Sequence, residues 1–239
     1  MFTGQHALIT GGSRGIGLAI AKKLSDLGAT ITLVARSSDS TSILSQLSTS
    51  YDQQHRFHTK DLLKLVDEDA SDLIPKDVTM LVNCAGVTTH SLLSHTSHKD
   101  IIDTINLNLL VPIILSKQVI KPMIKNRKLN PSILNISSVL SITDYKMAGT
   151  SVYASSKAGL LGLTTSLAYE LKGRVRVNSL LPGLVKETDM GSQVKLTEDL
   201  PLVSLSCVVE EAVKILGGDM NGECVVLDKS DSYTLPSIK

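Results

Sequence analysis

The feature of this sequence that most constrains its fold is the glycine-rich segment Thr10-Gly11-Gly12-Ser13-Arg14-Gly15-Ile16-Gly17. The apolar run 7–9 precedes it, and a segment of helical period, 18–24, follows at once. α/β folds hold a pyrophosphate in this way, because glycines let backbone N–H groups approach the phosphates and the helix dipole favours negative charge. A tight turn without a ligand is the plainer interpretation, but the flanking strand and helix are the surroundings that a dinucleotide site requires. The segment therefore predicts cofactor contacts from Gly11, Ser13, Arg14, Gly15, Ile16 and Gly17.

Along the rest of the chain, apolar runs of strand length alternate with segments of helical period, which is typical of a parallel sheet covered by helices on both faces. We expect one α/β domain over residues 1–239, a Rossmann-type doubly wound parallel sheet of seven strands. The predicted strands are 5–10, 29–35, 56–60, 78–83, 132–137, 175–181 and 223–227. The predicted helices are 15–27, 40–49, 62–73, 98–127, 152–172 and 207–216.

Two of these helices are less regular in sequence. The Ser- and Thr-rich segment 37–50 could be a linker, but a break there would separate the second strand from its sheet, so we interpret it as a weak helix. Pro112 and Pro122 each remove a backbone hydrogen bond, so we expect a kink within 98–127.

Composition and charge exclude several classes of protein. With 24 Lys plus Arg against 23 Asp plus Glu, the net charge of +1 is too small for nucleic acid to be the main partner. No run approaches 18 apolar residues, so we expect no membrane span. The three cysteines, Cys84, Cys207 and Cys224, form no CxxC pair and no histidines share a ligand spacing, so we expect no disulfide framework and no metal.

The first residues carry no secretory signal, because the run 7–9 is too short for a signal's hydrophobic region. Arg14, Lys22 and Lys23 all precede the first acidic residue, Asp26, as they would in a mitochondrial presequence. The simpler interpretation is that this stretch is the first strand, loop and helix of the fold.

Arg36 ends the second predicted strand, about twenty residues beyond the glycine-rich segment. An NAD site has an acidic residue at this place to bind the ribose hydroxyls, whereas an arginine pairs with the 2′-phosphate of NADP. Arg14 is a second cation that could reach this phosphate, and Ser37 adds a hydroxyl. The alternative is two solvated surface arginines, and we favour NADP(H).

Several motifs together resemble the short-chain dehydrogenase/reductase family over nearly the whole chain. Besides the glycine-rich segment, these are Asn83-Cys84-Ala85-Gly86, Asn135-Ile136-Ser137-Ser138, Tyr153-Ala154-Ser155-Ser156-Lys157, Asn178-Ser179-Leu180-Leu181-Pro182-Gly183 and Glu187-Thr188-Asp189-Met190. The resemblance implies catalytic roles for Ser138, Tyr153, Lys157 and Asn108.

These roles agree with elementary chemistry. Tyrosine, with a pKa of about 10, exchanges protons poorly near neutrality. Lys157 follows Tyr153 by four residues and so shares its helical face, from which we expect its ammonium to lower the phenol pKa and to bind the nicotinamide ribose. Ser138 would hold the carbonyl oxygen, with Ser137 as the alternative. Asn108 would bend its helix and bind a water that leads to Lys157.

Further cofactor contacts are implied by the resemblance alone. Asp61 is similar to the family's adenine contact, and Asn83, Ala85 and Gly86 to its adenine-ribose turn. Around the nicotinamide carboxamide we expect Pro182, Gly183, Val185 and Thr188. Cys84 is expected to fill space in the core and not to act as a nucleophile.

Within the family, the motifs are most similar to 3-oxoacyl-[acyl-carrier-protein] reductases and to the related mitochondrial-type carbonyl reductases. This implies reduction of a 3-oxoacyl thioester on an acyl-carrier protein, in the mitochondrial matrix or, alternatively, the cytoplasm. A carbonyl, quinone or steroid reductase and a nonenzymatic cofactor-binding subunit are the alternatives. The family's usual helix faces, 98–127 and 152–172, imply a homotetramer or a mixed assembly with a paralogous subunit.

Three departures from the family pattern affect the substrate side. Ser138 and Tyr153 are fifteen positions apart, which is longer than usual, Lys186 is inserted, and Asp228-Lys229-Ser230-Asp231 replaces an expected Asp-Gly-Gly. Two cationic clusters fit either carrier-protein docking or solvated helix ends. They are Lys125, Arg127 and Lys128, and Lys172, Arg174 and Arg176.

Overall fold

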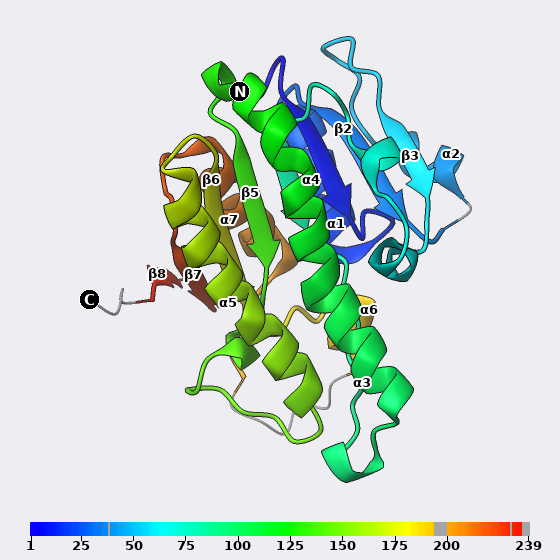
Figure 1. Cartoon of the computed structure of the whole chain (residues 1–239), viewed down its shortest axis with the longest axis vertical. Helices are drawn as coiled ribbons and strands as arrows, with labels where there is room; N and C mark the ends of the chain where they lie inside the picture. Colours follow the sequence, from blue (N-terminus) through cyan, green and yellow to red (C-terminus); the bar gives the residue numbers. More distant parts are fainter. Residues whose placement is uncertain (38, 194–199, 230, 236–239) are drawn as a thin grey trace.

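One sheet organises the chain (Figure 1). The computed structural model describes residues 1–37, 39–193, 200–229 and 231–235. The strands are β1 (His6–Thr10), β2 (Thr30–Ala35), β3 (Arg56–Thr59), β4 (Met80–Asn83), β5 (Ser132–Ile136), β6 (Arg176–Pro182), β7 (Cys224–Asp228) and β8 (Asp231–Thr234). They are ordered β3-β2-β1-β4-β5-β6-β7-β8, and the first seven are parallel, which confirms the doubly wound Rossmann-type sheet.

The predicted number of seven strands was wrong by one. After Asp228 the chain reverses, with Lys229 at φ 57°, and β8 pairs antiparallel with β7 at the edge of the sheet. All four residues of β8 are exposed, so the segment has neither the alternation nor the apolar run by which a strand is recognised. Ser230 lies outside the described residues.

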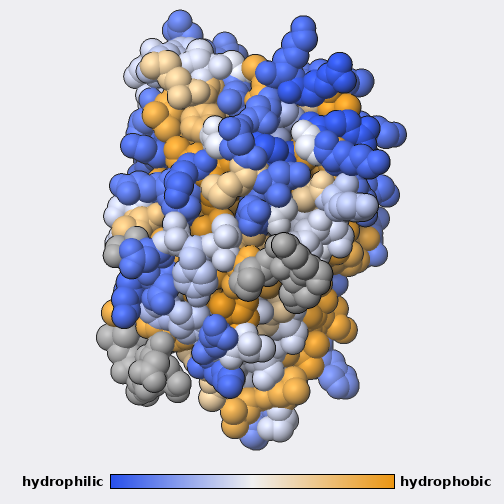
Figure 2. Space-filling view, turned by 90° about the vertical axis from the view of Figure 1, so that its left-hand side faces the viewer, coloured by the Kyte–Doolittle hydropathy of each residue, from blue (hydrophilic) through white to orange (hydrophobic). Residues whose placement is uncertain are grey.

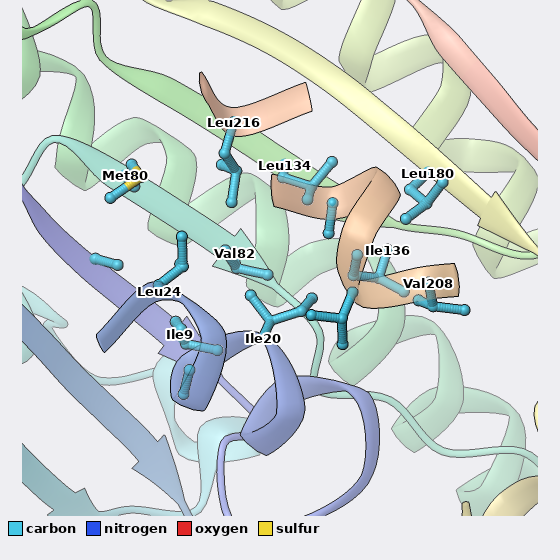
Figure 3. Close-up of a cluster of buried hydrophobic side chains, with 14 of the residues drawn as sticks. Ile9, Ile20, Leu24, Met80, Val82, Leu134, Ile136, Leu180, Val208 and Leu216 are labelled. Carbon is cyan, nitrogen blue, oxygen red and sulfur yellow. The ribbon is translucent and has the colours of Figure 1, made fainter. Parts of the chain in front are cut away.

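Helices cover both faces of the sheet (Figure 1). α1 (Gly15–Asp26) and α7 (Leu205–Gly217) pack on one face, and α4 (Val111–Lys125) and α5 (Ser151–Leu171) pack on the other. The first of these two cores is drawn in Figure 3, where side chains of α1 and α7 meet those of β1, β4, β5 and β6. Because side chains alternate along a strand, Ile9 joins this core while Leu8 joins the other.

Two predicted helices are shorter than expected. The segment 40–49 forms only α2 (Ser40–Leu44), and 62–73 forms two 3₁₀ turns, Leu62–Val66 and Ser71–Leu73. Small polar side chains stop both segments by binding backbone groups. Ser45 Oγ donates to the Ser42 carbonyl at 2.9 Å, and Asp69 accepts from the Ser71 N–H at 3.2 Å.

The predicted helix 98–127 is interrupted in the turn before Pro112, whereas it continues through Pro122. It comprises α3 (His98–Ile105), a π-helical turn Asn106–Leu110, and α4, in which Pro112 lies in the first turn. By length and composition His98–Lys125 could cross a membrane, but core helices meet the same criterion. Here Val111, Leu115, Val119 and Met123 of α4 are buried in a core of the sheet.

Candidate active site

The carboxyl ends of β1, β4, β5 and β6 border a cavity of 840 Å³. Ligands of open α/β sheets bind at this edge, where the strand order reverses. The lining includes most of the predicted site: Gly11, Ser13, Arg14, Gly15, Ile16, Gly17, Arg36, Ser37, Asp61, Ala85, Gly86, Ser138, Tyr153, Lys157, Pro182, Gly183, Val185 and Thr188. Asn83 and Asn108 are predicted site residues that do not line it.

The glycine-rich segment has no room for side chains at Gly11 and Gly17, where its backbone packs against other backbone. Gly11 has φ 68°, and a Cβ there would lie 2.9 Å from Ala85 Cα. A Cβ at Gly17, in the first turn of α1, would lie 2.5 Å from the Gly11 carbonyl oxygen. The loop therefore packs backbone against backbone, and its N–H groups and the start of α1 fit the phosphates of a dinucleotide.

Thr10 joins this loop to the segment after β4, a role that the sequence analysis missed. Its hydroxyl accepts hydrogen bonds from the N–H groups of Cys84 at 3.0 Å and Ala85 at 3.1 Å. A buried threonine at the end of β1, one residue before the first glycine, was the available signal.

Four cationic side chains among the described residues line the cavity, and they differ in what they are bonded to. Arg36 has no ion-pair partner among the described residues, and Ser37 beside it accepts from the Asp39 N–H at 3.2 Å. Lys60 pairs with Glu68 and Arg14 with Asp189. Lys157 Nζ, the fourth, donates to the Ile136 carbonyl at 2.7 Å. Among these four, Arg36 and Lys157 have no carboxylate partner in the described part of the chain, and Arg36 is the one at the end of β2, where a 2′-phosphate would lie.

The two adjacent serines after β5 have different surroundings. Ser137 is buried and donates to the backbone carbonyl of Lys157 at 2.9 Å, so its hydroxyl is used in the fold. The Ser138 hydroxyl accepts from the Leu140 N–H at 3.2 Å and hydrogen-bonds the Tyr153 phenol. Ser138 is therefore the serine placed to share an oxygen ligand with Tyr153, in agreement with the preference drawn from sequence.

Tyr153 and Lys157 differ from expectation in their electrostatics. Burial raises the pKa of Tyr153 to about 12, although the hydrogen bond with Ser138 lowers it. Burial also lowers the pKa of Lys157 to about 8. The ammonium lies 5.9 Å from the centre of the tyrosine ring and is bonded to the Ile136 carbonyl. The expected lowering of the tyrosine pKa by this lysine was thus wrong for the protein alone, because desolvation outweighs a charge at this distance.

Asn108 lies in the π-helical turn, where the predicted helix 98–127 is interrupted. Its amide forms two 2.9 Å hydrogen bonds with Val87, accepting from the N–H and donating to the carbonyl, and also donates to Ser156 Oγ at 3.0 Å. The side chain thus clamps the segment that follows Gly86 to α5. It is fully buried, and its proposed bond to a water stays a prediction.

Asn83 is placed differently from the adenine-ribose role that the resemblance implied. It is buried, and its side chain donates to Asn135 Oδ1 at 2.9 Å, whose own amide donates to Thr164 Oγ1 at 2.9 Å. This chain of amides joins β4, β5 and α5 beneath the cavity. Asp61 does line the cavity, and it caps the following 3₁₀ turn by accepting from the Leu63 N–H at 3.1 Å.

On the far side of the cavity, the segment after β6 closes against the residues that follow 199. The Leu184 N–H donates to the Pro201 carbonyl at 2.7 Å, and a Cβ on Gly183 would lie 2.3 Å from that oxygen. The short helix α6 (Asp189–Ser192), which the sequence did not predict, is capped by Thr188. The Thr188 hydroxyl accepts from the Gly191 N–H at 3.0 Å and donates to the Val185 carbonyl at 2.8 Å.

The cationic clusters lie away from this cavity, which disfavours the docking interpretation of the two that the sequence left open. Lys125, Arg127 and Lys128 precede β5, and Lys172 and Arg174 precede β6, whereas the cavity lies at the opposite ends of these strands. Arg176 is buried and donates to the carbonyls of Ile215 at 3.0 Å and Leu216 at 2.7 Å. Its guanidinium is therefore used in hydrogen bonds within the fold and not for docking a partner.

Cys84 lines the cavity, and burial raises the pKa of its thiol to about 11. The thiol therefore stays protonated near neutrality, which suits the predicted packing role. Among the described residues no group of three His, Cys, Asp or Glu side chains could hold a metal ion.

The chain is similar to known proteins. Residues 5–199 match a family model described as short chain dehydrogenase. The chain is 36% identical over 187 residues to the 3-oxoacyl-[acyl-carrier-protein] reductase FabG of Rickettsia prowazekii (strain Madrid E), covering 77% of this chain and 74% of that protein. It is 34% identical over 212 residues to FabG of Vibrio harveyi, covering 86% and 82%. A crystal structure of a blue fluorescent protein from a metagenomic library in complex with NADPH superposes with a TM-score of 0.80 at 26% identity, covering 96% of this chain and 98% of that one.

Proposed function

The chain belongs to the short-chain dehydrogenase family of oxidoreductases, and we propose that its substrate is a 3-oxoacyl thioester carried by an acyl-carrier protein. With NADPH, the chain would reduce this substrate to the 3-hydroxyacyl thioester. The observation that carries the proposal is the meeting of the Ser138 and Tyr153 hydroxyls at the cavity, with the Lys157 ammonium buried behind them.

The residues around the cavity fit the cofactor. The glycine loop leaves its backbone free for the pyrophosphate, and Arg36 stands where a 2′-phosphate would lie. When bound, NADPH supplies a hydride to the carbonyl carbon of the substrate. The relatives named above as 3-oxoacyl-[acyl-carrier-protein] reductases and the NADPH-bound structure support this assignment.

The chain's own groups manage the carbonyl oxygen. Ser138 donates a hydrogen bond to that oxygen, which stabilises the negative charge that develops during reduction. Tyr153 transfers its phenolic proton to the same oxygen, so that the C=O becomes C–OH. Because the pKa of Tyr153 is about 12, the phenol starts fully protonated at neutral pH. Lys157 places positive charge 5.9 Å from the tyrosine ring centre, which opposes the negative charge of the phenolate left behind, although desolvation outweighs it in the protein alone.

Several side chains that line the cavity are apolar, beside polar ones such as His90 and Thr150. Leu140, Met147, Met190 and Leu200 are among the apolar ones, and the first two come from the loop that follows Ser138. An acyl chain next to the reacting carbonyl would be buried against such side chains. This supports a thioester with an alkyl chain as the substrate class.

The same chain is proposed to self-associate. Hydrophobic side chains reach the surface at the lower right of Figure 2. Among the exposed apolar residues are Ile102 on α3, Ile113 on α4 and Tyr169 on α5, with exposures of 56%, 40% and 83%. A homotetramer would bury side chains of this kind, and light scattering of the purified chain measures its mass.

The substrate proposal is tested by NADPH oxidation with acetoacetyl-acyl-carrier protein, beside acetoacetyl-coenzyme A, a simple quinone and an NADH control. We expect turnover with the carrier-protein substrate and NADPH, and little with NADH. If only the quinone is turned over, the proposed substrate class would change from thioesters to general carbonyl compounds. Tight NADPH binding without turnover of any of them would contradict the reductase assignment.

A further inference from the structure

Two loops that border the cavity are joined by an ion pair across its rim. Arg14 Nη1, from the glycine-rich segment, lies 3.0 Å from Asp189 Oδ2, at the start of α6. Both residues line the cavity, and they belong to segments about 175 residues apart in the chain. The ion pair therefore connects the loop that cradles the phosphates to the segment on the opposite side.

The two segments also come close beside the ion pair. A Cβ placed on Gly15 would lie 3.5 Å from the methyl carbon of Thr188, so little space separates them there. The Thr188 hydroxyl holds α6 together through the Gly191 N–H and the Val185 carbonyl. Asp189 is thus presented to Arg14 by a segment with its own internal hydrogen bonds.

The other cations of the cavity show why this pairing matters. Asp189 engages the Arg14 guanidinium, so Arg14 is aimed at α6. Arg36 lines the cavity at the end of β2, and its guanidinium has no ion-pair partner in the part of the chain that the structure describes. The structure thus separates two arginines that the sequence analysis had assigned to one phosphate.

We propose that the Arg14–Asp189 ion pair is a clasp that holds the segment Glu187–Ser192 over the bound dinucleotide, while Arg36 alone selects for the 2′-phosphate. The proposal rests on the proposed use of NADPH and adds two positioning residues to it. Because the clasp does not touch the 2′-phosphate, it slows the release of NADPH and NADH alike. Both side chains are largely exposed, at 73% and 66%, so the effect is modest, about two- to fivefold on the dissociation constant.

The test measures the dissociation constant and release rate of NADPH and of NADH by nucleotide fluorescence, without a carbonyl substrate. The variants are Arg14→Gln, Asp189→Asn, the double variant and Arg36→Gln, with Arg127→Gln as a control for loss of an exposed arginine far from the cavity. We expect each clasp variant to weaken both nucleotides by the same factor through faster release. The double variant should be no weaker than either single one, because all three lack the same ion pair. Arg36→Gln should weaken NADPH alone.

Asp189→Asn distinguishes the clasp from a simple charge effect on nucleotide affinity, because the two predict opposite changes. Removing a carboxylate near phosphates would by itself tighten nucleotide binding, whereas loss of the clasp weakens it. Tighter NADPH binding by Asp189→Asn, or a loss in Arg14→Gln confined to NADPH, would show that Arg14 reads the 2′-phosphate and would overturn the proposal.

A measurement on the free protein keeps this test independent of the proposed function. Amide hydrogen exchange over 184–192 should speed up to the same extent in Arg14→Gln, Asp189→Asn and the double variant. Unchanged exchange in all three would overturn the clasp even if nucleotide binding by the chain is weak.

Discussion

The Tyr145 hydroxyl donates a 2.9 Å hydrogen bond to Asp228 Oδ2 and so ties the loop between Ser138 and Tyr153 to the end of β7. The lengthened loop, one departure from the family pattern, supplies the tyrosine, and the last residue of β7, just before the altered turn, supplies the carboxylate. Tyr145 and Leu200 both pack against the small buried cluster of Val139, Leu181, Cys224 and Val226, and Leu200 also lines the cavity. The hydrogen bond thus holds the loop at a cluster that borders the cavity.

Removing this hydroxyl should cost stability. Asp228 Oδ1 is buried and has no hydrogen-bond partner in the described part of the chain. Tyr145→Phe also removes the partner of Oδ2, so among the described residues no side chain would donate to either carboxylate oxygen. A hydrogen bond to a charged group contributes about 1.5–3 kcal/mol, and we expect a loss of that size in urea unfolding. Tyr169→Phe, at a residue 83% exposed, is the control and should be neutral. Equal unfolding midpoints for the two variants would show that the contact is not formed in solution.

Two glycines should respond in opposite directions to a methyl group. Gly11→Ala places a Cβ 2.9 Å from Ala85 Cα at a residue with φ 68°, so we expect a loss of about 1–3 kcal/mol in stability and loss of nucleotide binding. Gly162→Ala, within α5, meets no atom within 4 Å and should gain about 0.5–1 kcal/mol from helix propensity. Thermal unfolding of the pair with and without NADPH measures both effects. Retention of nucleotide binding by Gly11→Ala would contradict the loop geometry.

The buried His6 should make the fold sensitive to mild acid. Its ring forms hydrogen bonds with Asp77 at 2.9 Å and Thr32 at 2.8 Å. Burial lowers the pKa of His6 and outweighs Asp77, which raises it. The nearby charges of Arg56 and His55 lower the pKa further. The unfolded chain therefore takes up this proton at a higher pH than the folded one, so stability is complete above the unfolded pKa of about 6.5 and falls as the pH decreases below it. Urea unfolding of the native chain should weaken below that pH more steeply than that of His6→Gln. The exposed His95→Gln is the control, and an identical pH dependence in all three would refute the assignment.

Lys157 should impose the same trend, stability rising with pH, in the alkaline range. Its pKa of about 8 in the fold lies below the ordinary 10.5, so between these values the unfolded chain holds more protons and stability rises with pH. Relative to Lys157→Met, the native chain should therefore gain stability from about pH 8 to about pH 10.5. Lys23→Met, at an exposed residue of α1, should show no such relative gain. A constant difference between native and Lys157→Met across this range would mean that the lysine is not desolvated.

The sequence predicted the elements whose pattern is set by burial. The apolar runs of β1, β2, β4, β5, β6 and β7 are buried nearly throughout, and α1 and α5 begin and end within a residue of their predicted bounds. The elements that it missed or lengthened are governed by polar side chains. The exposed residues of β8 and the backbone bonds of Ser45 and Asp69 leave no periodic signal.

The candidate site shows a similar division. Residues on a strand end or in a glycine turn, such as Gly11 and Ser138, were placed correctly at the cavity because local geometry decides where they lie. Partners across the sheet could not be read from spacing. Asn83 turned toward Asn135, Arg14 toward Asp189, and the cationic ends of α4 and α5 came to lie at the edge of the sheet opposite the cavity.

The most direct test of the proposed reductase uses NADPH deuterated at C4 of the nicotinamide, with acetoacetyl-acyl-carrier protein as substrate. Mass spectrometry of the product from the native chain should show a 3-hydroxyacyl thioester carrying one deuterium. The Tyr153→Phe variant should bind NADPH normally and form this product about 10²- to 10⁴-fold more slowly, because the proton donor is lost. Absence of the labelled product from the native chain, or formation of it at the native rate by Tyr153→Phe, would contradict the account.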